Sequence, residues 1–195
     1  PLANGISRCD WDFPDKELDP RHMLVRYSGS LASDMTLDSV LRVASAVEEI
    51  SDGVNLKFEI NTSHHFYAKH ATKFRKFTST NIFDSYLPES KYREWLNEAD
   101  LLIVAYNFDT KSTDYMRYSV ANKMPECMAS GVPILIHGPK GVATVDYLLS
   151  ESCAFAVTEP DQGLLQSKLM DLLDDPVKRK LYANRAKQIA FDKHD

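Results

Sequence analysis

The sequence predicts an α/β fold, in which a parallel β-sheet is covered by helices on both faces. Short apolar segments alternate along the chain with longer segments whose apolar residues recur at helical spacing. The clearest strand is 101–106, a continuous apolar run typical of a parallel strand buried on both faces. The clearest helix is 36–50, where apolar residues recur from Leu37 to Val47. Strands that alternate with helices indicate a parallel sheet.

The remaining elements follow the same two patterns. The expected strands are 23–27, 55–60, 78–83, 101–106, 133–137 and 154–158. The expected helices are 36–50, 64–73, 89–98, 119–131, 142–149, 162–173 and 177–193. Gly131 is expected to end one helix and Pro133 to open the strand after it. The last two helices have no strand partner, so we expect them to pack across the domain.

Composition narrows the class of protein. A length of 195 residues suits one domain with a sizeable core. The net charge is −5 and no basic block is visible, which argues against a nucleic-acid-binding domain. No apolar run approaches the ~18–20 residues of a membrane span, and no signal peptide is visible. The three cysteines show no paired spacing, which favours reduced thiols and a cytoplasmic location.

Ligands of open α/β sheets bind beyond the carboxyl ends of the strands. That rule selects the loops 28–34, 61–65, 107–114 and 137–141 as candidate parts of a site. In the first loop, Gly29 allows close approach of the backbone and Ser30 offers a hydroxyl, although a simple turn is the commoner explanation. His137 ends a predicted strand at the same edge.

The segment 118–138 carries the most information. In a helix over 119–131, Ser119, Asn122 and Glu126 would share one face, and apolar residues would occupy the other. Polar side chains near the start of a helix in an α/β fold suit an anionic ligand. A solvated surface helix would show the same spacing.

This segment resembles the donor-binding motif of GT-B glycosyltransferases, especially the retaining group related to family 4 (glycosyl transferases group 1). One branch of that group has the motif Tyr-Ser-x-Pro-Asn-Lys-x-x-Glu-x-x-Ala-x-Gly-x-Pro. The matching residues here are Tyr118, Ser119, Asn122, Lys123, Glu126, Ala129, Gly131 and Pro133. The chain departs from the branch at Ala121, where proline is frequent. It departs from the better-known Glu-x7-Glu form at Tyr118, which replaces the first glutamate.

The resemblance implies a Rossmann-like GT-B C-terminal domain at 22–195, preceded by an interdomain linker and the start of the domain at 1–21. The N-terminal residues support this, because Pro1 to Ile6, followed by Phe13 and Pro14, resemble the segment that joins the two halves of family 4-like enzymes. The chain begins with Pro1 rather than Met, which indicates either processing or a start inside a longer protein. The implied partners are a nucleotide-sugar donor and a missing N-terminal acceptor domain. Peripheral membrane association of the full enzyme is compatible with this class.

The resemblance also implies roles. The enzyme would transfer a sugar from a nucleoside diphosphate sugar with retention of configuration, without a metal or other cofactor. Glu126 would bind the ribose, Asn122 the phosphate or sugar, and Lys123 would stabilise the departing diphosphate together with amides near Ser119. The role of Tyr118 stays open. His137 and its neighbouring amides are further candidates for donor contacts.

One departure concerns the diphosphate. The family often places Arg directly after the glycine of the first loop and Lys soon after it, but this chain has Ser30 and no matching Lys. Lys123 or Arg117 could substitute, and for Arg117 a solvated surface charge is the simpler interpretation. Two alternatives therefore stay open: a nucleotide-sugar epimerase of GT-B architecture, and a non-catalytic nucleotide-binding or interaction domain.

Three histidines, His64, His65 and His70, lie close together in the sequence and could be considered as metal ligands. No third-ligand spacing and no supporting carboxylates accompany them, so we expect surface or strand-end histidines.

Overall fold

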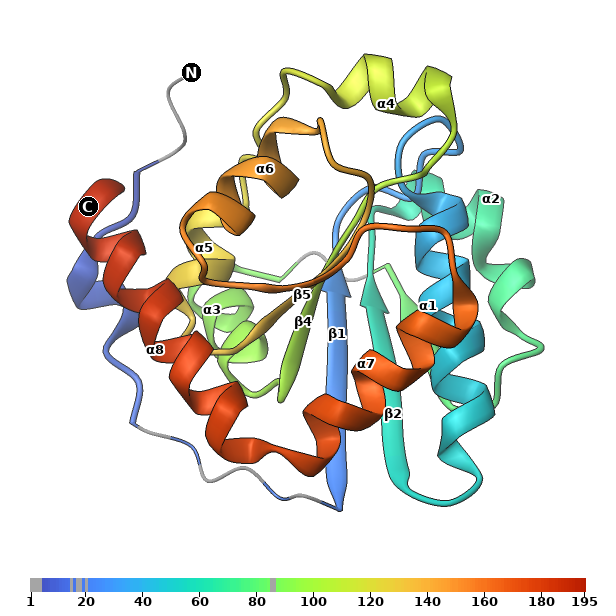
Figure 1. Ribbon diagram of the computed structural model, residues 1–195, viewed down its shortest axis with the longest axis horizontal. Helices are drawn as coiled ribbons and strands as arrows, with labels where there is room; N and C mark the ends of the chain where they lie inside the picture. The colour runs from blue at the N-terminus through green and yellow to red at the C-terminus, as the bar shows by residue number, and fades with distance from the viewer. Residues whose placement is uncertain (1–4, 15, 17–18, 20, 85–86) are drawn as a thin grey trace.

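The protein is described from a computed structural model, which places residues 5–14, 16, 19, 21–84 and 87–195. Its centre is a six-stranded sheet in the order β3-β2-β1-β4-β5-β6, and every strand pair is parallel (Figure 1). The strands are β1 His22–Ser28, β2 Asn55–Asn61, β3 Thr80–Phe83, β4 Leu101–Ala105, β5 Ile134–His137 and β6 Phe155–Val157. The predicted α/β, Rossmann-like class is confirmed.

The strand order places a change of direction at the middle of the sheet. From β1 the chain builds outward to β2 and β3, and it then returns to the other side of β1 with β4, β5 and β6. A crevice beyond the carboxyl ends of the strands is expected at such a point.

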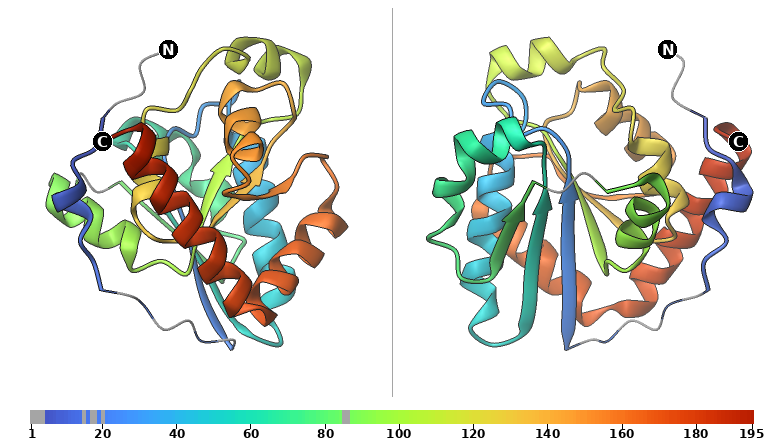
Figure 2. Two further views of the ribbon diagram at one scale, coloured as in Figure 1. Left: turned by 60° about the vertical axis from the view of Figure 1, so that its left-hand side comes forward. Right: turned by 180° about the vertical axis from the view of Figure 1, so that it is seen from behind.

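Helices cover both faces, as the views in Figure 2 show. One face carries α1 Leu37–Ser51, α2 His64–Phe74 and α7 Gln162–Asp174. The other carries α3 Glu89–Asn97, α5 Met124–Ala129, α6 Ala143–Ser150 and the long α8 Pro176–Lys193, which packs against α5. The last helix therefore crosses the domain as predicted.

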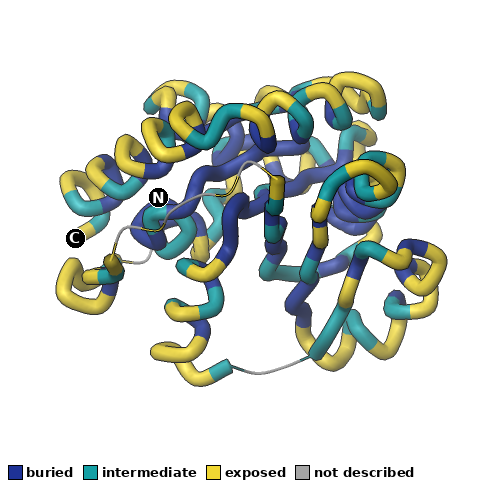
Figure 3. The backbone as a smooth tube through the Cα atoms, turned by 90° about the horizontal axis from the view of Figure 1, so that it is seen from below, coloured by how far each residue is buried: buried dark blue, intermediate teal, exposed yellow. Residues whose placement is uncertain are grey.

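Each face of the sheet has its own hydrophobic core. Along β4, Ile103 packs into the core under α1 and α7, whereas Leu102 packs into the core under α3, α5 and α8. Because successive side chains of a strand point to opposite faces, a strand with two buried faces must be apolar throughout. Figure 3 shows the resulting distribution, with buried residues along the strands and exposed residues on the outer turns of the helices.

The prediction of a helix over 119–131 was wrong at its start. Helix α5 begins only at Met124, so Ser119 and Asn122 precede it and do not share a helical face with Glu126. The reason is Pro125, which stands in the first turn. In a helix starting at 119, its ring would clash with the carbonyl of Ala121 and its missing N–H would break the ladder. The end of the helix was predicted correctly, since Gly131 has φ +72°.

The loop predicted at 107–114 contains an additional helix, α4 Thr110–Met116. Asp109 caps it by accepting a hydrogen bond from the Ser112 amide at 2.9 Å. The break between the last two helices lies where it was predicted. There Asp175 accepts from the Lys178 amide at 2.8 Å and caps α8, which begins at Pro176.

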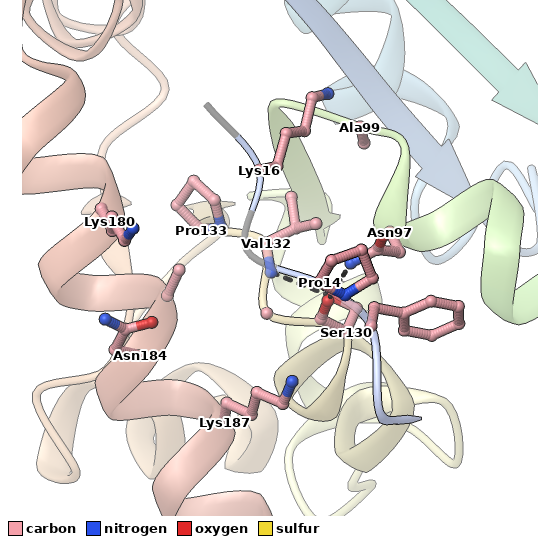
Figure 4. Close-up of a pocket in the computed structure, with 13 residues that line it drawn as sticks. Pro14, Lys16, Asn97, Ala99, Ser130, Val132, Pro133, Lys180, Asn184 and Lys187 are labelled. Carbon is pink, nitrogen blue, oxygen red and sulfur yellow. Dashed lines mark hydrogen bonds between the residues drawn. The ribbon is translucent and has the colours of Figure 1, made fainter. Parts of the chain in front are cut away.

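The described part of the N-terminal segment runs along α8 and includes a short 3₁₀ helix, Arg8–Trp11. Trp11 is buried, and the Ile6 amide donates to the His194 carbonyl at 2.8 Å. A small pocket of about 40 Å³ lies between this segment, the α5–β5 turn and α8, with Pro14, Ser130 and Asn184 among its lining residues (Figure 4). Residues 1–4, which carry much of the linker resemblance, lie outside the described residues.

Two further expectations from composition can be compared with the structure. All three cysteines are free thiols: Cys9 is exposed, Cys127 is half-buried and Cys153 is buried. Within the described residues, no helix has the length and apolarity needed to cross a membrane.

Candidate functional site

A cleft of about 740 Å³ opens beyond the carboxyl ends of β1, β2 and β3. Its walls come from the β1 and β2 ends, the starts of α2 and α3, and the start of α5. The lining residues are Ser28, Gly29, Ser30, Asn61, Thr62, Ser63, His64, Phe66, Asp84, Leu87, Glu89, Tyr92, Lys123 and Glu126. The cleft therefore lies at the predicted edge of the sheet, on the β2 side of β1, and no residue of the loop after β4 is among its described lining.

The first wall is the loop after β1, which is held by its own hydrogen bonds. The Gly29 amide donates to the Asn61 carbonyl at 3.1 Å, and the Thr62 hydroxyl donates to the Gly29 carbonyl at 2.7 Å. A Cβ atom on Gly29 would lie 2.9 Å from the Tyr27 hydroxyl oxygen, so a larger residue would have to displace the Tyr27 ring from its hydrogen bond to the Ser30 carbonyl. The Gly29 amide is already paired, whereas the hydroxyls of Ser28 and Ser30 line the cleft as possible donors to a ligand.

Lys123 and Tyr92 form the opposite wall. The Lys123 ammonium lies 3.3 Å from the Ser28 hydroxyl oxygen and 4.7 Å from the centre of the Tyr92 ring. This cation–π contact keeps the Lys123 side chain extended over the cleft, so that its ammonium group lies beside the loop after β1. The buried Tyr92 hydroxyl lies near the Ser28 hydroxyl but makes no hydrogen bond of normal geometry with a described residue. Burial raises the pKa of Tyr92, so the phenol is neutral and can donate to a ligand oxygen.

Glu126 is the half-buried carboxylate of the cleft. Burial raises its pKa, and the nearby charge of Lys123 opposes that shift. No side chain or amide in the described parts of the chain donates a hydrogen bond to its carboxylate. Its oxygens face the cleft, where the hydroxyl groups of a ligand can replace water as hydrogen-bond donors.

The loop before α5 is pinned from beneath by Thr144. Its hydroxyl oxygen accepts from the Ala121 amide at 2.9 Å and from the Tyr106 hydroxyl at 3.0 Å, and it donates to the Ser119 carbonyl at 3.2 Å. This network fixes the backbone that leads to Lys123. The polar side chains of the loop face outward: Ser119 and Asn122 are exposed, and Tyr118 is 83% exposed.

The structure therefore brings together four of the predicted site residues, Gly29, Ser30, Lys123 and Glu126, in one cleft. Tyr118, Ser119 and Asn122 lie on the adjoining exposed loop and do not line it. Tyr92, Asp84 and Glu89 line the cleft but were not predicted as site residues. Tyr92 has the apolar spacing of an ordinary core residue in its helix, so the sequence contains no signal that sets it apart.

The loop after β2 forms the remaining wall. His64 Nδ1 lies 2.6 Å from an Asp84 carboxylate oxygen and links the start of α2 to the end of β3. His65 is exposed and His70 is buried, so the three histidines do not converge. In the described ranges, no group of three or more His, Cys, Asp or Glu side chains is placed to hold a metal ion.

The loop after β4 serves the fold instead of a ligand. Asn107 is buried, and its side-chain oxygen accepts from the amides of Asp38 and Ser39 at 3.0 and 3.2 Å. Its side-chain nitrogen donates to the Ser33 carbonyl at 3.0 Å. The start of α1, where an anion could otherwise bind, is thus occupied by a side chain of the protein.

His137 is fully buried beside Phe108, with 4.9 Å between the ring centres, and it does not line the cleft. Neither ring nitrogen makes a hydrogen bond of normal geometry with a described residue, although the Val157 backbone lies near enough to favour the charged form. Burial lowers the pKa of His137 to about 4. The residue is therefore a neutral part of the core. It does not lie in the cleft, where it would have to be to contact a donor.

This burial predicts that the free energy of unfolding falls as the pH drops from about 6.5 toward 4. In that window the unfolded chain binds a proton at His137 and the folded chain does not, so the slope is at most about 1.4 kcal/mol per pH unit. Above pH ~6.5 the residue adds no slope. Urea denaturation between pH 4.5 and 8 measures the effect.

The matched comparison is His137→Leu. His70 and His194, whose pKa values burial also lowers, are present in both proteins, so the difference in slope isolates His137. If the variant keeps the full wild-type pH dependence, the assignment of a neutral buried imidazole is wrong.

No protein-family model matches the sequence, and no curated protein matches it. Solved structures do match. One is WaaG, a glycosyltransferase involved in lipopolysaccharide biosynthesis, with 18% identity, a TM-score of 0.67, and coverage of 100% of this chain and 52% of that one. Another is a trehalose-phosphate synthase from E. coli bound with UDP-2-fluoro glucose, with 11% identity, a TM-score of 0.70, and coverage of 96% and 47%. A third is HepE from Anabaena in complex with UDP and glucose, with 11% identity, a TM-score of 0.69, and coverage of 90% and 45%.

The chain has the fold of a GT-B C-terminal domain. The likeness extends over nearly all of its length, whereas it spans only about half of each of these proteins. The resemblance predicted from the segment 118–133 is therefore confirmed for the fold.

Proposed function

We propose that residues 22–195 form the donor-binding half of a glycosyltransferase, and that the cleft binds a nucleoside diphosphate sugar. The observation that carries the proposal is Glu126, a half-buried carboxylate without a protein donor, placed across the cleft from hydroxyl groups and beside Lys123. The solved structures with UDP-2-fluoro glucose or UDP and glucose support this ligand class.

The proposed roles follow from position. Glu126 accepts hydrogen bonds from the ribose hydroxyls. Lys123, with the hydroxyls of Ser28 and Ser30, surrounds the diphosphate and stabilises the negative charge that grows on it when the sugar leaves. Tyr118, Ser119 and Asn122 lie on the exposed loop beside Lys123, where they are free to contact the sugar or a second domain.

The complete reaction needs more than this domain. We propose that an acceptor domain, connected through the segment 1–21, provides the other side of the cleft, where excluding water and aligning the acceptor become possible. We further propose that the sugar is transferred with retention of its anomeric configuration and without a metal ion. The proposed location of the enzyme is the cytoplasm.

Isothermal titration calorimetry tests donor binding directly. UDP, GDP, ADP, dTDP and CDP, each alone and as a sugar conjugate, are titrated with EDTA present and again with Mg²⁺. We expect one-site binding by one base family that does not require Mg²⁺. No binding by any member of the panel would refute the proposed site.

Lys123 gives a second test, because it is the lone Lys or Arg side chain among the described residues that line the cleft. Lys123→Met should weaken binding of the nucleoside diphosphate roughly tenfold, the value of one hydrogen bond to a charged group, and leave binding of the nucleoside unchanged. The exposed Lys111→Met is the matched control. An equal loss for nucleoside and diphosphate would show that Lys123 does not contact phosphate.

A non-catalytic nucleotide-binding domain is the second candidate. It is favoured by Ser30, which stands where the family often has an arginine, and by the presence of a single lysine among the described residues of the cleft. Turnover of the bound donor by the full-length protein separates the two candidates. No feature of the cleft favours the epimerase alternative.

A further inference from the structure

A second groove, separate from the donor cleft, lies between α1 and α2. Its volume is about 560 Å³, within the range of small-molecule sites. The lining residues are Asp38, Leu41, Arg42, Ser45, Thr72, Lys73, Lys76, Phe77 and Gln162. Helix α2 contributes to both sites: Ser63 and His64 at its start line the donor cleft, whereas Thr72 and Lys73 near its end line the groove.

Positive charge is concentrated on this part of the chain. The segment 62–83 contains Lys69, Lys73, Arg75 and Lys76 and no acidic residue. With a net charge of −5 for the whole chain and +4 for this segment, the remainder carries −9. Lys69, Lys73 and Lys76 are exposed. Lys69 and Lys73 lie four residues apart on one side of α2, and Lys76 follows two residues after the helix ends.

The cations of the groove are not paired with carboxylates of the described residues, and the nearby Glu49 instead accepts from the Ser45 hydroxyl at 2.9 Å. Arg42, Lys73 and Lys76 form no ion pair with any carboxylate in the described residues. Arg42 Nη1 donates to the Pro160 carbonyl at 3.2 Å, and the Lys76 ammonium lies 4.8 Å from the centre of the Phe77 ring. The lining contains three cationic side chains and a single acidic one, Asp38.

We propose that this groove binds a phosphate-bearing small molecule, at a site independent of the donor cleft. A phosphomonoester carries close to two negative charges at neutral pH, which balances three cations and one carboxylate. Arg42 presents a planar donor fork, and the two lysines add point charges. Leu41 and Phe77 provide apolar surface for the organic part of the ligand, and Thr72 adds a hydroxyl.

The acidic remainder of the chain argues against a nucleic acid as the ligand, because an extended polyanion would be repelled beyond the groove. A single phosphomonoester meets no such repulsion. The same group occurs on soluble metabolites and on the headgroup of phosphatidic acid, so the chemistry is shared and the source is decided by experiment.

The test is a titration of the ¹⁵N-labelled chain with glycerol 3-phosphate, followed by amide chemical shifts. We expect saturable shifts at α1 and at the second half of α2. The variant Lys73→Gln/Lys76→Gln should weaken this binding roughly 100-fold, since each lost charge-assisted hydrogen bond accounts for about tenfold. Lys57→Gln/Lys111→Gln removes the same charge from exposed positions outside the groove and should retain binding.

Two further measurements complete the design. Vesicles of phosphatidylcholine with phosphatidic acid, compared with pure phosphatidylcholine, show whether a lipid headgroup is the source; capture that depends on Lys73 and Lys76 supports the proposal with a lipid ligand. Lys123→Met keeps groove binding if the two sites are independent. The proposal is overturned if neither phosphate source binds, if both double variants lose binding equally, or if shifts occur only around the donor cleft. A donor cleft that fails to bind nucleotide would not change these readouts.

Discussion

Replacement of Asn107 by alanine is expected to lower the free energy of unfolding by about 3–4 kcal/mol, the largest effect of a single substitution that we predict. The side chain is only 2% exposed and pairs with two amides at the start of α1 and with the Ser33 carbonyl. Alanine leaves all three groups without their protein partner, and of these the Ser39 amide is buried. Urea denaturation measures the loss.

Two further variants test whether the loss comes from the hydrogen bonds of Asn107. Asn107→Asp keeps an acceptor for the Asp38 and Ser39 amides but loses the donor to Ser33, so its loss should be smaller than that of alanine. Asn122→Ala removes an amide from an exposed loop and should stay within about 0.5 kcal/mol of wild type. If Asn107→Ala were as stable as Asn122→Ala, the hydrogen bonds assigned to Asn107 would not support α1.

Most helices and strands could be predicted from the sequence, because the spacing of apolar residues matches the faces that each element buries. In β4, Leu102 and Ile103 face different cores, which is why the run is apolar throughout. The start of α5 was predicted too early. The polar and apolar residues of 119–123 keep helical spacing, but a helix that includes them would place Pro125 in its interior. The short α4 is too brief to show a helical apolar period, and its local signal is the capping residue Asp109, which accepts from the Ser112 amide.

The candidate site was predictable where chain order controls position. Gly29 and Ser30 follow the strand at the centre of the sheet, and Lys123 and Glu126 lie at the start of a helix that reaches the same edge. Tyr92 could not be found in this way, because its place beside Lys123 depends on how α3 packs against α5, and helical spacing alone does not specify packing. His137 also ends a strand, yet its side chain points into the core, since all four residues of β5 are buried.

Replacement of Glu126 by glutamine is expected to weaken nucleotide binding roughly 10- to 100-fold and to leave the fold intact, because one or two hydrogen bonds to a charged acceptor are lost. Thermal unfolding without ligand should be nearly unchanged, since no described protein group donates to this carboxylate. If the residue instead supports the fold, the variant will lose stability before any ligand is added, and the proposed role will be wrong.

A comparison of nucleotides with and without ribose hydroxyls tests the proposed role of Glu126 more specifically. If Glu126 accepts from the ribose hydroxyls, the wild-type protein will prefer a ribonucleoside diphosphate over its 2′,3′-dideoxy analogue, and Glu126→Gln will lose most of that preference. The matched control is Glu89→Gln, an exposed carboxylate of the same cleft that pairs with Arg93 at 2.6 Å. It should keep the wild-type preference, because its carboxylate already has a partner within the protein. Equal affinity of the wild-type protein for the two nucleotides would place the ribose away from Glu126, and the cleft would then need a different orientation of the donor.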